Sequence, residues 1–146
     1  RLKVFDINLR QQFYSLEVIE ASAQRANIMK LNDEELVILS HMLQLGTTDV
    51  ETQCRTLLSR YALHMLVLTC GTNGSYIYTA DETYFRKTPL VQVADTVGAG
   101  DSFTATLVSD LLRGTPIAEA HEHAVKVAAY VCTQKGAMAE WPAQGF

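Results

Sequence analysis

The sequence is organised around Ala94-Asp95-Thr96-Val97-Gly98-Ala99-Gly100-Asp101-Ser102-Phe103, in which small and acidic residues precede an apolar pattern. The apolar positions recur as on one face of a helix, at Phe103, Leu107, Val108, Leu111 and Leu112. The stretch therefore predicts a loop that leads into the N-terminus of a helix.

Such a junction is a candidate anion site. The first N–H groups of a helix have no intrahelical partner, and the aligned peptide dipoles leave partial positive charge there. Gly98, Ala99 and Gly100 carry little side-chain bulk, so a phosphate could approach the backbone. Beside a phosphoryl group, Asp101 could accept a proton from a hydroxyl nucleophile. The alternative is that Asp101 complements the helix dipole and the glycines form a tight turn.

Composition excludes several classes of protein. The 146 residues suffice for one domain with a core, and 48% of them are hydrophobic. The net charge of −4 comes without a cluster of Lys and Arg, so we expect no nucleic-acid binding. No apolar run approaches the roughly 20 residues of a membrane span, and the start lacks a signal-peptide pattern, so we expect a cytoplasmic protein that binds no membrane. The three cysteines have no C-x-x-C spacing and indicate neither disulfides nor zinc.

The rest of the chain predicts alternating strands and helices. The run at 64–69 is apolar throughout, which is typical of a strand buried on both faces of a parallel sheet. We expect further strands at 2–8 and 27–31 and a hairpin of 76–79 with 83–86. We expect helices at 15–25, after Asn32, from a cap at Thr48 to Tyr61, up to Arg113 with a stop at Gly114, and from a cap at Thr115, followed by Pro116, to near Gly136. This order indicates an α/β protein with a mostly parallel sheet.

Polar residues follow two of the expected strands. Asp6, Asn8 and Arg10 end the first one, where ligands usually meet an α/β sheet, although they could also only complete turn hydrogen bonds. Asn32 and Glu35 have the spacing of a capping box, and that structural account is complete by itself.

The 95–103 segment resembles the second signature of the ribokinase-like (pfkB-type) carbohydrate kinases, D-T-x-G-A-G-D-x-F. Further segments are similar to family landmarks and occur in the family's order: Val4-Phe5-Asp6-Ile7-Asn8-Leu9-Arg10, Lys30-Leu31-Asn32-Asp33-Glu34-Glu35, Thr69-Cys70-Gly71-Thr72-Asn73-Gly74 and Lys135-Gly136-Ala137. The resemblance spans essentially the whole chain. Through Asp6-Ile7-Asn8-Leu9-Arg10-Gln11 it is greatest to the fructokinases.

The resemblance implies roles for the central loop. Asp101 would be the catalytic base that takes the proton from the sugar hydroxyl, and the N–H groups of Gly98, Ala99 and Gly100 would form the anion hole. Asp6, Asn8 and Arg10 would be substrate residues.

The resemblance also implies cofactor sites. Asn32 and Glu35 would place Mg²⁺ and the phosphates through water, a role compatible with capping. In some members of the family a monovalent cation such as K⁺ lies at the positions that match Asp95 and Val97.

ATP would meet three residues around the end of the 64–69 strand and two near the C-terminus. Thr69, Gly71 and Gly74 would face the nucleotide, and the helix around His123 with the turn at Gly136 would border its adenine. A plain turn is the alternative for the two glycines at 71 and 74.

The fold that the resemblance implies is a three-layer, ribokinase-like α/β fold with a mostly parallel central sheet. Residues 1–146 would be the C-terminal, nucleotide-binding and catalytic part of a single kinase domain. The implied function is ATP-dependent phosphorylation of a sugar hydroxyl, as in a fructokinase, and the intact enzyme could form a homodimer.

Two alternatives to a fructokinase stay open. One is a kinase for ribose, 2-keto-3-deoxygluconate or a nucleoside, and another is a non-catalytic nucleotide-binding homologue. A Rossmann-type dinucleotide binder is disfavoured because Phe103 stands where its third glycine would be.

The family's glycine-rich sugar signature and small β lid precede the matched region, so most of the sugar pocket would lie outside residues 1–146. We therefore predict that these residues alone bind nucleotide weakly and do not phosphorylate sugar. A coupled assay of ADP release measures this, and fructose-dependent turnover would contradict it.

Overall fold

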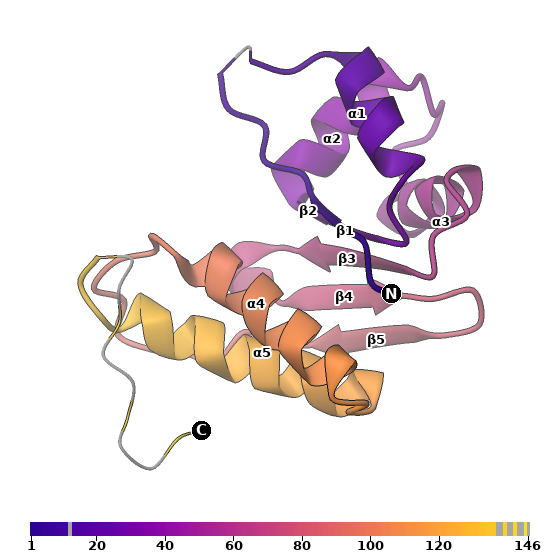
Figure 1. The fold of residues 1–146 in the computed structure, drawn as a ribbon. Helices are drawn as coiled ribbons and strands as arrows, with labels where there is room; N and C mark the ends of the chain where they lie inside the picture. The colour runs from indigo at the N-terminus through magenta and orange to yellow at the C-terminus, as the bar shows by residue number, and fades with distance from the viewer. Residues whose placement is uncertain (12, 137–138, 140–141, 143–144, 146) are drawn as a thin grey trace. The chain divides into compact units, whose positions relative to one another are not determined.

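The computed structural model describes residues 1–11 and 13–136, together with 139, 142 and 145 (Figure 1). They divide into one unit of Arg1–Gly71 with Ser75–Phe85 and another of Thr72–Gly74 with Arg86–Phe146. Ala137, the last residue of the Lys135-Gly136-Ala137 landmark, lies outside the described residues.

The first unit is built on a five-stranded mixed sheet. Its strands, in spatial order, are β1 (Val4–Asp6), β2 (Ile28–Asn32), β3 (Met65–Thr69), β4 (Ser75–Tyr78) and β5 (Thr83–Arg86). The first three are parallel, and β4 is antiparallel to β3. The predicted parallel core is thus confirmed, and so is the hairpin, in which the Thr79 N–H donates to the Glu82 carbonyl at 2.9 Å.

The core of this unit lies between the sheet and three helices, which are α1 (Leu16–Ala23), α2 (Asp33–Met42) and α3 (Val50–Arg60). Successive strand residues point to opposite faces, so Met29 and Leu31 of β2 meet the helices while Lys30 faces away. Leu39 of α2 and Leu57 of α3 are fully buried in the same core. Burying one such side chain contributes about 2 kcal/mol, which is why the helices stay on the sheet.

Side-chain caps begin all three of these helices. Ser15 accepts a hydrogen bond from the Val18 N–H, and Asn32 begins α2 as expected. The expected cap at Thr48 is wrong, because Asp49 is the N-cap of α3 and accepts from the Thr52 N–H at 2.8 Å. Both residue types are good caps, and the local backbone decides between them.

A short connection joins β3 to its antiparallel neighbour β4. It contains the single 3₁₀ turn η1 (Gly71–Asn73), with Gly71 at a φ of 53° and Gly74 at a φ of 115°. Glycine adopts such angles with the least strain, so the two glycines form a turn here, which is also compatible with a phosphate beside the backbone.

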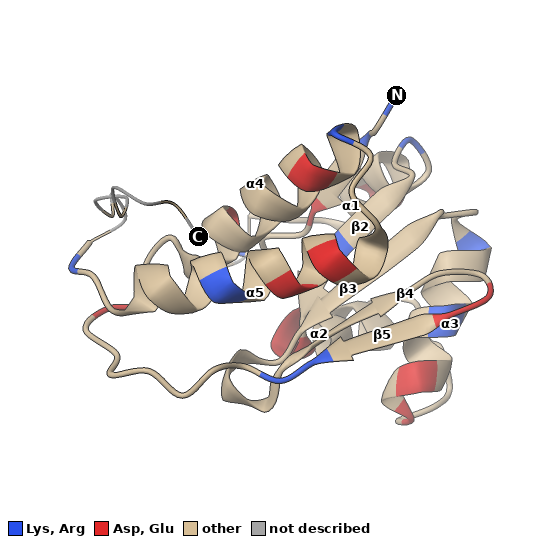
Figure 2. Cartoon of the chain, turned by 90° about the horizontal axis from the view of Figure 1, so that it is seen from below, with Lys and Arg blue, Asp and Glu red and all other residues tan. Residues whose placement is uncertain are grey.

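The second unit contains two neighbouring helices, α4 (Ala99–Leu112) and α5 (Ile117–Cys132). Figures 1 and 2 show them side by side. Gly114, at a φ of 82°, follows α4 as predicted. The N-cap of α5 is Pro116, so the expected cap at Thr115 is wrong by one residue. Residues 87–98, all described, contain no regular element.

No helix in the described part of the chain is both long enough and apolar enough to cross a bilayer.

His121 is the one fully buried titratable side chain of α5 among the described residues. Its ring packs edge-on against the Phe103 ring at a centroid distance of 6.0 Å. Burial, aided by the positive charge of Arg86, lowers the pKa of His121 from 6.5 to about 4.

We predict that this histidine makes stability pH-dependent. The unfolded state takes up a proton below pH 6.5, whereas the folded state resists it down to about pH 4. The stability that depends on a neutral His121 is therefore fully present above pH 6.5. The free energy of unfolding should fall by on the order of 3 kcal/mol as the pH drops from 6.5 to 4. Urea unfolding at several pH values measures this. His121→Leu should flatten the profile, whereas the control His64→Gln, at an exposed residue, should leave it unchanged.

Candidate active site

The carboxyl ends of the three parallel strands place Asp6, Asn32 and Thr69 along one edge of the sheet. The strand register sets Asn32 opposite Thr69, and Asp6 opposite Lys30, two residues before Asn32. In α/β proteins, ligands bind outside this edge. The structure thus brings together three residues that the sequence proposed separately.

Asn32 and Glu35 form a complete capping box at the start of α2. The Asn32 Oδ1 accepts from the Glu35 N–H at 2.8 Å, and the Glu35 Oε2 accepts from the Asn32 N–H at 2.8 Å. Glu35 is only 7% exposed, and its Oε1 accepts a third bond, from the Leu9 N–H at 3.2 Å. The predicted cap is therefore confirmed.

These residues also fit a role toward Mg²⁺. A carboxylate has about four lone-pair sites, and the two backbone donors occupy two of those on Glu35. Mg²⁺ takes oxygen ligands and keeps several of its waters. A water bound to the metal could therefore donate to Glu35 without disturbing the cap.

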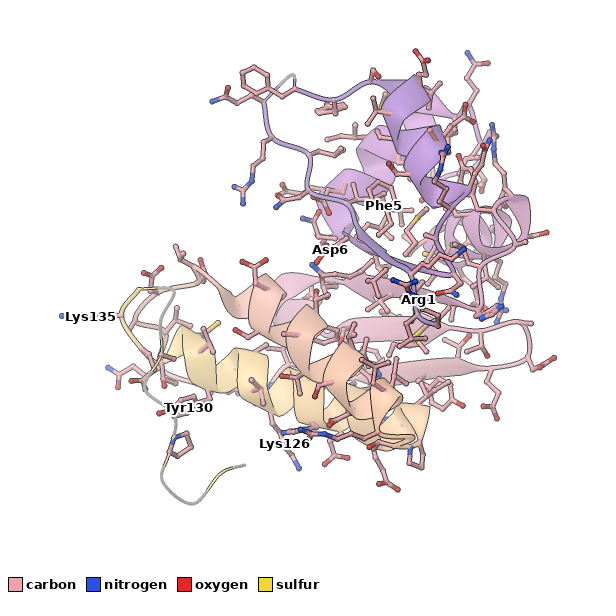
Figure 3. The ribbon with its side chains drawn as sticks, in the orientation of Figure 1. Arg1, Phe5, Asp6, Lys126, Tyr130 and Lys135 are labelled. Carbon is pink, nitrogen blue, oxygen red and sulfur yellow. The ribbon has the colours of Figure 1, made fainter. Side chains whose placement is uncertain are left out.

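Asp6 has a partner that the sequence did not suggest. The Lys30 Nζ lies 3.0 and 3.2 Å from the two Asp6 carboxylate oxygens, and the Lys30 side chain is 12% exposed. Phe5, labelled beside Asp6 in Figure 3, packs instead against the core under the helices. A lysine within the apolar stretch Ile28–Leu31 was the signal that could have identified the pair.

The end of β3 offers an accessible backbone. Gly71 has a positive φ, and a Cβ built on it would meet no atom within 4 Å. The space beside Gly71 is therefore open, as a site for a phosphate beside the backbone requires.

In the second unit, α4 begins in the manner that the sequence predicts. Its N-cap is Gly98, at a φ of 83°, and no side chain in the described chain caps it. Asp101 is exposed in the first turn. The N–H of Ala99, one of the three proposed anion-hole groups, donates to the Thr96 carbonyl at 3.3 Å. This N–H therefore already has an acceptor within the loop.

Asp95 ties this loop to the end of α5. Its Oδ1 accepts from the Val97 N–H at 3.0 Å and its Oδ2 from the Gly136 N–H at 3.1 Å. These bonds lower the pKa of Asp95. The Asp95 N–H in turn donates to the Cys132 carbonyl at 3.2 Å. Three proposed site residues, Asp95, Val97 and Gly136, are thus in direct contact.

His123 lies apart from that cluster. Its Nδ1 is 2.6 Å from an oxygen of Asp110, a 6% exposed residue near the end of α4. His123 and Cys132, the last residue of α5, are nine positions apart, which corresponds to a rise of about 13 Å along the helix. A groove along α4 is lined by both Asp101 and His123. No sequence pattern indicates the pairing of His123 with Asp110, because the two residues belong to different helices.

A sheet that carries polar side chains at its carboxyl edge, and a glycine-capped helix with an acid in its first turn, are suited to a phosphotransferase. The chain matches the model of the pfkB family of carbohydrate kinases over residues 1–144, and it belongs to that family.

Known relatives agree with this membership. The chain is 32% identical over 149 residues to the aminoimidazole riboside kinase of Salmonella typhimurium, covering 95% of this chain and 45% of the relative. The crystal structure of that enzyme from Salmonella enterica, complexed with aminoimidazole riboside and an ATP analogue, superposes with a TM-score of 0.79 at 30% identity, covering 94% of this chain and 48% of that one. The crystal structure of the fructokinase of Vibrio cholerae O395, with fructose, ADP and calcium bound, superposes with a TM-score of 0.77 at 28% identity. The match covers 94% of this chain and 46% of that one.

The expected fold is confirmed by these superpositions. The chain has a ribokinase-like α/β fold with mostly parallel central strands. It spans about half the length of the curated relatives it matches.

We predict opposite effects of alanine at the two glycines around the start of α4. Gly98→Ala should lower the free energy of unfolding by about 1 kcal/mol or more, because its φ of 83° is strained for a residue with a Cβ. Gly100→Ala, the matched control, lies inside α4 and should raise it by up to about 1 kcal/mol. Urea unfolding measures both, and a Gly98→Ala protein as stable as the parent would contradict the left-handed cap.

Proposed function

We propose that the whole protein transfers the γ-phosphoryl group of ATP to a hydroxyl of a sugar or ribosyl substrate. The observation that carries the proposal is Asp101, which is exposed in the first turn of α4, three residues after the glycine N-cap. Membership of the pfkB family of carbohydrate kinases also supports it.

In the proposed mechanism, Asp101 accepts the proton of the attacking hydroxyl, and the positive end of α4 stabilises the charge on the transferring phosphoryl oxygens. Little covalent chemistry is required of the protein, so positioning and electrostatics account for most of the rate. The bonds of Asp95 hold the loop in shape before the substrates arrive.

The remaining residues would bind the nucleotide and its metal. We assign Thr69, Gly71 and Gly74 to ATP, and Asn32 with Glu35 to the waters of Mg²⁺. Bound Mg²⁺ would supply charge neutralisation at the phosphates. We also keep Gly136 and His123 as the adenine-side residues, and Asp95 with Val97 as the monovalent-cation positions.

The acceptor is proposed from likeness. The two relatives compared above bind aminoimidazole riboside and fructose. We favour fructose because of the Asp6–Gln11 segment, and place Asp6, Asn8 and Arg10 on the substrate side. A panel of fructose, ribose, 2-keto-3-deoxygluconate and nucleosides distinguishes the acceptors, and a protein that binds ATP but phosphorylates none of them would be the non-catalytic homologue.

We predict that Asp101→Asn lowers turnover by at least about 10²-fold, because the amide cannot accept the proton. ATP binding, measured by calorimetry, should change little. The matched control is Asp81→Asn, which makes the same charge change at an exposed residue between β4 and β5 and should be as active as the parent. Parental turnover in Asp101→Asn would refute the role of the base.

A further inference from the structure

Glu35 makes one more hydrogen bond than its capping box needs. The box uses the Oε2 atom, which accepts from the Asn32 N–H. The Oε1 atom accepts from the N–H of Leu9, a residue 26 positions earlier in the chain. Glu35 is 7% exposed, so both bonds lie largely out of water, where a bond to a charged acceptor is strong.

Leu9 belongs to the segment that follows β1. Ile7 is 2% exposed and its N–H donates to the Lys30 carbonyl at 2.8 Å, which extends the parallel pairing by one residue. Leu9 packs against the core of the first unit. Asn8, which lies between Ile7 and Leu9, and Arg10, which follows Leu9, are exposed.

Fixing the Leu9 N–H therefore restricts its two neighbours. The Leu9 N–H lies in the peptide plane that joins Asn8 to Leu9, so its hydrogen bond to Glu35 fixes that plane. Leu9 also packs against the core, so its position limits where the chain continues to Arg10. The Glu35 side chain thus holds the backbone of the 8–10 segment through this hydrogen bond.

We propose that Glu35 is a positioning residue that holds the 8–10 segment, and with it Asn8 and Arg10, in the geometry that receives the acceptor substrate. This rests on the proposed function, in which that segment lies on the substrate side. Glu35 would thereby link the start of α2, assigned to Mg²⁺ and phosphate, to acceptor binding.

Two substitutions separate this role from a role of charge alone. Glu35→Gln keeps the capping bond through its single carbonyl oxygen, but turns an NH₂ group toward the Leu9 N–H. Glu35→Asp keeps the negative charge, but its side chain is one methylene shorter. Both changes should break the bond to Leu9, and only the first removes the charge.

The matched control is Glu34→Gln. Glu34 stands in the same turn of α2, is exposed, and lies outside the capping box. It undergoes the same charge change without touching the 8–10 segment.

The experiment uses the whole protein and measures two quantities. Amide hydrogen exchange at Leu9 should accelerate by about tenfold or more in Glu35→Gln and Glu35→Asp, while exchange at Leu39, in the middle of α2, reports that the helix remains folded. Steady-state kinetics should show a rise of about tenfold in KM for the acceptor and a smaller change in kcat. Glu34→Gln should match the parent in every measurement.

Three results would overturn the proposal. One is unchanged exchange at Leu9 in both variants. Another is faster exchange without a rise in KM for the acceptor. The third is a raised Mg²⁺ half-saturation with an unchanged acceptor KM, which would show that Glu35 acts in Mg²⁺ binding and not in acceptor binding. If Glu35→Gln does not fold, Glu35→Asp carries the same comparison. If the parent phosphorylates no acceptor, the proposed function fails, and the exchange at Leu9 still shows whether Glu35 holds the segment.

Discussion

The parallel pairing of β2 between β1 and β3 is the constraint on which the first unit depends. It aligns the carboxyl ends of three strands and thereby sets Asp6, Asn32 and Thr69 on one edge. Because Asn32 is both the last residue of β2 and the cap of α2, strand and helix meet without a loop. The first turn of α2 is consequently fixed to the sheet, and Glu35 with it.

Helices α2 and α4 show two ways of beginning a helix. At α2, Asn32 and Glu35 satisfy backbone donors reciprocally. At α4, the N-cap is a glycine, which has no side chain to offer the first N–H groups. An anionic ligand is the natural partner for such a terminus. The capped end is suited to holding its surroundings in place, whereas the glycine-capped end is suited to binding.

Features that depend on a few neighbouring residues could be predicted from the sequence. The loop that leads into α4, the stop at Gly114 and the capping box at Asn32 all follow from the preferences of the residues involved. Predictions erred by one residue at Thr48 and Thr115, since adjacent residues have similar preferences there. The family motif supplied the roles proposed for the site, which local preferences alone left ambiguous.

By itself, then, the sequence determined the order of strands and helices, the parallel core and the loop that precedes Asp101, because hydrophobic period and cap chemistry act over a few residues. Only the tertiary structure decided which residues become partners. Asp6 pairs with Lys30, Glu35 reaches Leu9, Asp95 holds Gly136, and His123 turns to Asp110. Each pair joins separate segments of the chain, and strand register and helix packing, which depend on the whole fold, bring those segments into contact.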